Sequence, residues 1–209
     1  MKYFSFAVLF VLFSCGNKED ILLPKSNVTI ISAVKDHSPI YIFFRTKGKD
    51  TLAEVNRKNS IISTNWILNI DKRLPLRLVI PEVMKLQEKK RSEVAHKNEL
   101  AENYYSYADS IGKNMAFLPF TNVYYKIGKP LNGGLIFHFK KGSDLVLIDN
   151  IKINKTEVLN YLYSINFAVN SKILLLFDKN MGFQEYLEIK ILIRELDTFN
   201  KDVPEEFIF

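Results

Sequence analysis

Cysteine is almost absent from this chain, whose 209 residues include only Cys15. A single cysteine cannot form a disulfide within the chain, so stability must come from a packed core. Histidine is also scarce, and the three that occur lie in a predicted loop, helix and strand without ligand spacing: His37, His96 and His138. Without cysteine, a zinc site would need histidine together with Asp or Glu, and no HExxH-type pattern is present. We therefore expect no metal site.

The motifs that mark common catalytic sites are missing as well. The 8 glycines form no Walker loop and no dinucleotide fingerprint, and no Gly-x-Ser-x-Gly sequence is present. The net charge of +6 comes from Lys and Arg residues that are scattered along the chain. This pattern favours weak attraction to anionic envelope surfaces over nucleic-acid binding. We expect no cofactor, no nucleic-acid partner and no enzymatic activity.

A long hydrophobic run is lacking too. The apolar run 3–13 is shorter than the roughly 20 residues that a membrane-spanning helix needs. Its length, after the positive charge of Lys2, is typical of a secretory signal. The sequence Leu12-Phe13-Ser14-Cys15 resembles the lipobox of bacterial lipoproteins, although Phe13 departs from the small or β-branched residue usual there. The resemblance implies a signal peptide over 1–14 and a lipid on Cys15, which becomes the new N-terminus. The alternative is a plain signal peptide with an incidental cysteine.

A polar tether is predicted over residues 15–26. It contains Lys18-Glu19-Asp20, which resembles the surface-export signal of lipoproteins in Bacteroidetes-type bacteria, a Lys followed by two acids. The alternative is a solvated linker without an address. We expect a cell-envelope protein held by its lipid in the outer membrane, on the periplasmic or the surface face.

The remaining chain predicts an α+β fold with mixed sheets and packed helices. β-branched and aromatic residues indicate strands, and 3.6-residue periodicity indicates helices. A helix is expected to begin near Pro75 and to continue toward Tyr107. Further helices are predicted over 156–163 and 183–196. The predicted strands are 28–31, 40–44, 51–55, 66–70, 123–125, 135–139, 145–148, 173–177 and 204–209.

Two parts of the sequence resemble each other. Residues 66–76 and 172–183 both read as a buried strand, an Asp-Lys pair, a turn and a helix start, with Asp71 and Asp178 in matching positions. Residues 42–50 and 136–144 match upstream in the same order. A duplicated unit of roughly 70 to 90 residues would explain this, and chance recurrence of a common pattern is the alternative. We predict one unit over 27–95, a helical and aromatic connector over 96–120 and a second unit over 121–209.

The second unit resembles the periplasmic domain of the ExbD/TolR family. The shared pattern is a buried strand that ends in Asp, then a helix and a final strand; it covers 121–209 and, more loosely, 27–90. Members of that family carry a transmembrane helix with a proton-carrying Asp, which we do not expect here. The resemblance therefore implies an envelope module that pairs with itself or with another protein, and not a proton-driven motor.

An aromatic cluster supplies the candidate binding residues: Tyr104, Tyr105, Tyr107, Tyr124 and Tyr125. Aromatic faces with polar handles suit a sugar ring or a partner's peptide, and the alternative is a packed join between the two units. Asp71 and Asp178 are expected to be structural acceptors at helix starts rather than catalytic acids. Two functions follow: a non-enzymatic interaction module that uses an open sheet edge, or a surface glycan- or nutrient-binding lipoprotein.

Overall fold

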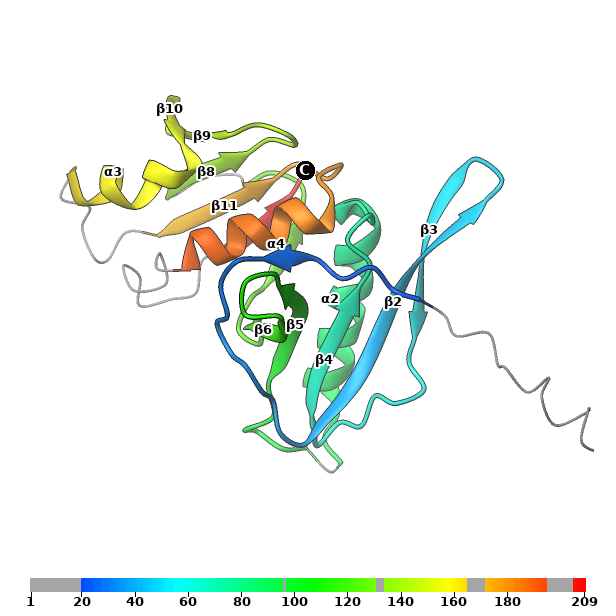
Figure 1. Ribbon diagram of the computed structural model, residues 1–209. Coiled ribbons are helices and arrows are strands. Elements are labelled where there is room, and N and C mark those ends of the chain that lie inside the picture. Colours follow the sequence, from blue (N-terminus) through cyan, green and yellow to red (C-terminus); the bar gives the residue numbers. More distant parts are fainter. Residues whose placement is uncertain (1–19, 96, 131–133, 165–171, 195–204) are drawn as a thin grey trace, which may run out of the picture.

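The computed structural model describes residues 20–95, 97–130, 134–164, 172–194 and 205–209 (Figure 1). Of the described residues, 22% are helical and 40% are in strands, and they form two mixed sheets of six strands, which confirms the α+β fold. The first sheet contains β1 (Lys25–Ser26), β2 (His37–Lys47), β3 (Asp50–Asn56), β4 (Asn65–Ile70), β5 (Asn103–Asp109) and β6 (Asn114–Pro119), with α2 (Leu76–Ser92) between β4 and β5. The second contains β7 (Tyr125–Ile127), β8 (Leu135–Phe139), β9 (Leu145–Ile148), β10 (Ile151–Asn154), β11 (Ile173–Phe177) and β12 (Glu205–Ile208), with η2 (Lys155–Glu157), α3 (Val158–Ser164) and α4 (Phe183–Leu192).

The two sheets share a four-strand unit. Its strand order is β3-β2-β4-β5 in the first sheet and β9-β8-β11-β12 in the second. In both, an antiparallel hairpin is followed by two parallel pairings, and a helix connects the last two strands. The N–H of Asp71 donates to the carbonyl of Ile42 at 3.0 Å, and that of Asp178 donates to the carbonyl of Phe139 at 3.1 Å. The two aspartates therefore occupy equivalent places, as the internal match predicts; common ancestry of the units stays a prediction.

The hairpins of the two units differ in length and turn. Gly48 has φ +61°, which suits the first central position of a type II′ turn between the paired Lys47 and Asp50. The equivalent hairpin β8–β9 turns through residues 140–144, where Gly142 has φ +67°. Asp149 and Asn150, with φ 43° and 72°, instead form the type I′ turn between β9 and β10. β2 pairs with β4 only as far as Ile42, so residues 43–47 pair with β3 alone. Residues 43–54 thus form a two-stranded ribbon, the β2–β3 ribbon, which projects beyond the sheet (Figure 1).

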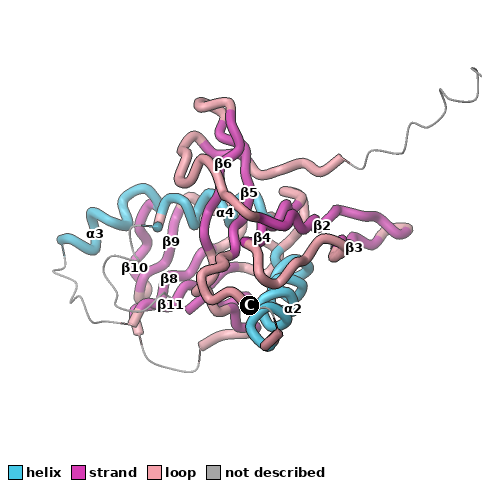
Figure 2. Tube along the Cα trace, turned by 90° about the horizontal axis from the view of Figure 1, so that it is seen from below, coloured by secondary structure: helices cyan, strands magenta, loops and turns pink. Residues whose placement is uncertain are grey.

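One hydrophobic core lies between the units. Figure 2 shows the two sheets side by side, with α3 at the far end of the second sheet. α2 buries Val79, Ile80 and Val83, the spacing of one helical face. The alternating residues Trp66, Leu68 and Ile70 of β4 contribute to the same core, as do Phe137 of β8 and Phe177 of β11. The units are therefore packed on each other through shared apolar side chains.

β11 is buried on both faces, as its continuous apolar run predicts. Its residues Leu175 and Phe177 belong to the central core, together with Leu187 of α4. Leu174 and Leu176 are also buried, but in a separate cluster with Phe207 on the other face of the sheet. The division follows from the alternation of side chains along a strand.

The N-terminal segment begins its contacts earlier than predicted. The carbonyl of Leu22 accepts the N–H of Lys72 at 2.8 Å, and β1 pairs in parallel with β5. The predicted strand at 28–31 is reduced to a single bridge between Ile31 and Phe117, where the segment covers the outer face of the first sheet. The predicted tether over 15–26 is therefore too long, because the folded body begins near Leu22.

The predicted helical connector over 96–120 is wrong. α2 ends at Ser92, and the following residues form the hairpin β5–β6 of the first sheet. The aromatic residues of β5 favour a strand, and their alternation fills both faces: Tyr105 and Tyr107 point into the central core, and Tyr104 packs on the outer face. The first unit therefore extends to about residue 120, and no long helix joins the units in the described part.

Candidate functional site

The N-termini of α2 and α4 bind each other's preceding loops. The first N–H groups of a helix have no partner within that helix. Here the N–H groups of Leu76 and Arg77 donate to the carbonyls of Met181 and Lys179, at 2.9 and 2.8 Å. In return, the N–H of Phe183 donates to the carbonyl of Leu74 at 2.9 Å. Backbone groups thus cap both helices and lock the two units together.

Asp71 and Asp178 are structural acceptors, but neither caps a helix as predicted. Asp71 is 1% exposed and accepts from the N–H of Arg73 at 3.0 Å and from its guanidinium at 2.7 and 2.9 Å. Burial acts to raise the pKa of Asp71, but the hydrogen bonds and charge of Arg73 outweigh it and hold that pKa below its ordinary value. Asp178 accepts the N–H of Asn180 at 2.8 Å within its own turn. The helix N-termini are out of reach because backbone carbonyls already occupy them.

Four of the five candidate tyrosines are buried, so they do not form an exposed binding surface. Tyr104, Tyr105, Tyr107 and Tyr125 are each at most 7% exposed, and only Tyr124 lies at the surface, 57% exposed. The large rings bury more area at the join between the units than at a solvent-facing patch. Tyr105 and Tyr125 thus lie at a packed join between the units, as the alternative describes, whereas Tyr104 packs on the outer face of the first sheet.

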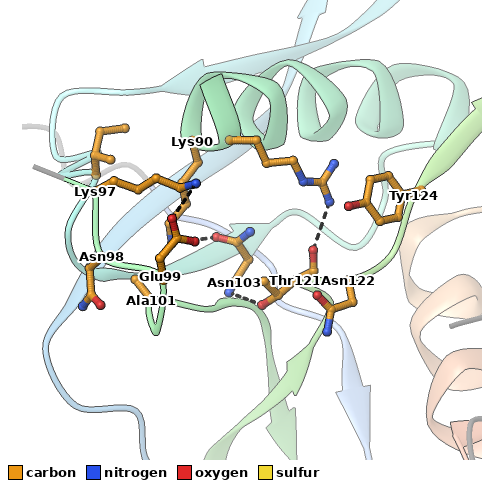
Figure 3. Close-up of a pocket in the computed structure, with 11 residues that line it drawn as sticks. Lys90, Lys97, Asn98, Glu99, Ala101, Asn103, Thr121, Asn122 and Tyr124 are labelled. Atoms are coloured by element: carbon orange, nitrogen blue, oxygen red, sulfur yellow. Dashed lines mark hydrogen bonds and ion pairs between the residues drawn. The ribbon is translucent and has the colours of Figure 1, made fainter. Parts of the chain in front are cut away.

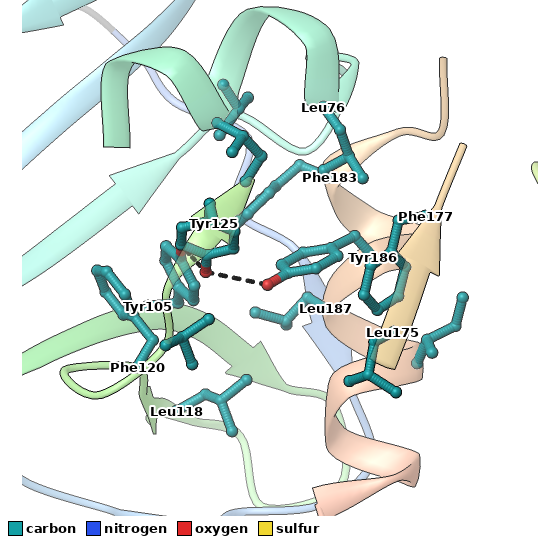
Figure 4. Close-up of a cluster of buried hydrophobic side chains, with 14 of the residues drawn as sticks. Leu76, Tyr105, Leu118, Phe120, Tyr125, Leu175, Phe177, Phe183, Tyr186 and Leu187 are labelled. Carbon is teal, nitrogen blue, oxygen red and sulfur yellow. Dashed lines mark hydrogen bonds between the residues drawn. The ribbon is translucent and has the colours of Figure 1, made fainter. Parts of the chain in front are cut away.

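Two of these tyrosines belong to a buried chain of hydrogen bonds (Figure 4). The hydroxyls of Tyr105 and Tyr125 lie 2.6 Å apart, and those of Tyr125 and Tyr186 lie 3.0 Å apart. The Tyr186 hydroxyl donates to Glu206 Oε2 at 2.7 Å. Lys190 Nζ lies 2.6 Å from Glu206 Oε1 and neutralises the buried carboxylate. The chain thereby links the first sheet to α4 and β12 of the second unit.

The ionisation of this chain is suppressed. Burial raises the pKa of Tyr105, Tyr125 and Tyr186 well above the ordinary value, and the charge of Glu206 adds to the effect at each phenol. Neutral phenols act as donors toward the carboxylate, so the chain is a structural connection and offers no surface to a ligand. Sequence reasoning missed Tyr186 and Glu206, because no local pattern brings residues from distant elements together.

Tyr124 lines a small polar cleft at the C-terminal end of α2 (Figure 3). The cleft has a volume of about 210 Å³ and lies between α2, residues 97–103 and residues 121–124. The Arg91 guanidinium carbon lies 4.1 Å from the centre of the Tyr124 ring, and Arg91 donates to the carbonyl of Thr121 at 3.0 Å. Asn98 and Asn122 also line the cleft. A single small polar ligand would fit such a space.

Lys90 forms the inner wall of this cleft. Its ammonium donates to the carbonyls of Thr64 and Glu102 and to Asn103 Oδ1, at 3.0 to 3.1 Å, and lies 4.9 Å from the centre of the Trp66 ring. Burial lowers the pKa of Lys90 to about 8, and the charge of Glu102 opposes that shift. An ammonium has three protons, and all are engaged. Lys90 therefore holds the cleft together and has no donor left for a ligand.

The other predicted features can be placed only in part. Cys15 lies outside the described residues. Among the residues that the structure describes, no group of three or more potential metal ligands comes together. No helix in the described ranges is both long and apolar enough to cross a membrane.

Comparison with protein-family models, with curated proteins and with solved structures finds no match for this chain. Its function must therefore be argued from the sequence and the geometry alone.

Proposed function

We propose that the protein is a lipid-anchored component of the cell envelope that acts as a non-enzymatic protein-interaction module. The anchor rests on the short apolar run that ends in Ser14-Cys15. The folded body begins at Leu22, and the seven steps from Cys15 can span at most about 25 Å. Such a short tether keeps the folded body close to the membrane.

The observation that carries the interaction role is the β2–β3 ribbon. β3 is the terminal strand of its sheet and, with 7 residues, is longer than β1, β6, β7 and β10 at the other sheet edges. Because Lys47 and Asp50 close the hairpin, every second residue of β3 directs its N–H and carbonyl away from β2. These outward residues are Thr51, Ala53 and Val55. An unpaired edge of this length can accept an extended segment of another chain.

Part of the other ribbon edge is open as well. Beyond Ile42, the residues of β2 have no β4 residue opposite them, so Phe44 and Thr46 direct their backbone groups away from the sheet. Arg73 lies 4.4 Å from the centre of the Phe44 ring and holds the base of the ribbon. The ribbon is therefore a two-stranded platform with a fixed base and two available edges. It would bind a partner protein or a second copy of the chain.

The test uses a proline where it removes an outward N–H without breaking the hairpin. Ala53→Pro should abolish partner binding, because proline has no N–H to donate and blocks strand addition. Lys152→Pro is the matched control. Lys152 lies in β10, the edge strand of the second sheet, opposite Leu147 of β9, and its N–H also points away from the neighbouring strand. A photo-crosslinker at Leu52, which is 44% exposed, reports contact in intact cells.

We expect a discrete crosslinked product that disappears with Ala53→Pro and persists with Lys152→Pro. A ribbon without adducts, or adducts unchanged by Ala53→Pro, would contradict the interaction role. Relation to ExbD/TolR-type transport-energising systems is part of this proposal, supported by the strand–Asp–helix–strand pattern. Recovery of a component of such a system in the adduct would support it.

The cleft favours a second candidate, a surface glycan- or nutrient-binding lipoprotein. Tyr124 is exposed beside the amides of Asn98 and Asn122, a combination that can stack on a sugar ring and hydrogen-bond to its hydroxyls. A glycan array with the mature protein would reveal this activity. Tyr124→Ala should then abolish binding while the melting temperature stays unchanged.

A further inference from the structure

The folded body carries a set of unpaired cations around the place where the N-terminal segment joins it. Backbone hydrogen bonds hold this region together: Leu22 accepts from Lys72, and the N–H of Arg77 donates to the carbonyl of Lys179. We call the surface formed by Leu22, Lys72, Arg77 and Lys179 the anchor-side face. Arg77 and Lys179 are exposed, and Lys72 is half-buried.

These cations differ from many others on the molecule. Some cations elsewhere are paired with acids, for example Arg57 with Glu82 at 2.8 Å and Lys126 with Glu205 at 2.9 Å, whereas others, such as Lys140, form no ion pair in the described residues. Within the described ranges, no carboxylate forms an ion pair with Lys72, Arg77 or Lys179.

Of the acids that lie beside them in the sequence, only Asp71 is paired with a cation. Asp71 is buried against Arg73, and Asp178 accepts the N–H of Asn180. The three cations outnumber the carboxylates here that form no ion pair in the described residues, Asp178 and Asp20, so the anchor-side face keeps a net positive charge.

We propose that the anchor-side face lies against the anionic headgroups of the membrane that holds the lipid anchor. This inference rests on the proposed anchoring at Cys15. The chain reaches the body at Leu22 after at most about 25 Å, so this face is the one nearest the bilayer. Basic groups close to an anionic membrane are attracted over about one Debye length, roughly 8 to 10 Å at physiological salt. Charge and tether thus act on the same face.

This orientation leaves the other end of the first sheet facing away from the membrane. Residues 31–36 precede the N-terminal end of β2, whereas Asp71 and Lys72 follow the C-terminal end of β4, which runs parallel to β2. The two loops therefore lie at opposite ends of the sheet. They provide one position that should contact headgroups and one that should not.

The experiment uses the full lipidated protein in vesicles, and it exploits the acylation of the only native cysteine. Asn180→Cys places a fluorophore beside Lys179, and Ser32→Cys places one at the opposite end; both positions are exposed. Quenching by nitroxide lipids labelled in the headgroup region is measured in pure phosphatidylcholine and with phosphatidylglycerol added. The charge variant is Lys72→Glu/Arg77→Glu/Lys179→Glu, and Lys35→Glu in the opposite loop is its control.

We expect phosphatidylglycerol to increase quenching at position 180 at least threefold, with no change at position 32. The increase should vanish in about 1 M salt and in the charge variant, and it should persist in Lys35→Glu. The salt and lipid comparisons need no charge substitution, so misfolding of the triple variant would not hide the answer. Equal quenching in both lipids, or stronger quenching at position 32, would overturn the orientation. Failure of the protein to float with vesicles of either composition would instead overturn the anchor itself.

Discussion

The buried tyrosine chain makes a graded prediction, because its hydrogen bonds have a direction. The carboxylate of Glu206 can only accept, so Tyr186 donates to it, Tyr125 donates to Tyr186, and Tyr105 donates to Tyr125. Replacing each tyrosine by phenylalanine keeps the ring and removes one hydroxyl. What remains unpaired then depends on the position of that hydroxyl in the chain.

The expected losses of unfolding free energy increase toward the carboxylate. Tyr186→Phe removes a donor from a buried charge and also leaves the Tyr125 hydroxyl without its acceptor, which should cost about 3 kcal/mol. Tyr125→Phe leaves the Tyr105 donor unpaired and should cost about 1 to 2 kcal/mol. Tyr105→Phe leaves no hydrogen-bond donor unpaired and should cost about 0.5 to 1 kcal/mol.

Urea denaturation of the three variants measures this order, with unchanged m-values as the sign of an intact native state. Tyr41→Phe is the control, because Tyr41 is half-buried and takes no part in the tyrosine hydrogen-bond chain; its ring centre lies 5.7 Å from that of Phe43. This substitution should leave the free energy of unfolding unchanged. Equal losses at the three chain positions, or the largest loss at Tyr105, would refute the assigned direction. The stacking of Tyr105 on Phe120, at 3.8 Å, is kept in Tyr105→Phe and cannot produce the gradient.

Four further substitutions test individual groups. Burial lowers the pKa of Lys90 from 10.5 to about 8, so between these pH values the unfolded state binds more protons than the native state. The free energy of unfolding of the wild type, relative to Lys90→Met, should therefore rise with pH across that range in denaturation curves. Asp178→Asn should be nearly neutral in thermal melts, whereas Asp71→Asn should cost about 1 to 2 kcal/mol because it removes the charge paired with Arg73; equal effects would contradict the two environments. Leu174→Ala should cost about 2 to 5 kcal/mol, and an unchanged denaturation midpoint would contradict its burial.

Much of the second unit could be predicted because its signals are local. The strands 135–139, 145–148 and 173–177 coincide with β8, β9 and β11, since each is a compact apolar run next to a turn. The equivalent places of Asp71 and Asp178 were also visible in the internal match. β10 was missed, because Ile151-Lys152-Ile153-Asn154 is short and mostly exposed.

The first unit shows where local signals mislead. The charged end of α2 runs without a Gly or Pro into residues 93–102, so nothing marked the end of the helix at Ser92. The alternation in Asn103-Tyr104-Tyr105-Ser106-Tyr107 was the available strand signal, and Gly112 marked the hairpin turn. The candidate site failed for a related reason. Clustering of tyrosines in sequence does not reveal which ones tertiary packing will bury.

The central claim, a lipid-anchored module, is tested most directly by mass spectrometry of the protein purified from envelope membranes. We expect a mature chain that begins at Cys15 and is heavier than its sequence by the mass of the attached acyl groups. Cys15→Ala should abolish both the cleavage and the added mass. A chain purified from the same membranes that carries an unmodified Cys15, or that begins at any other residue, would rule out the lipid anchor.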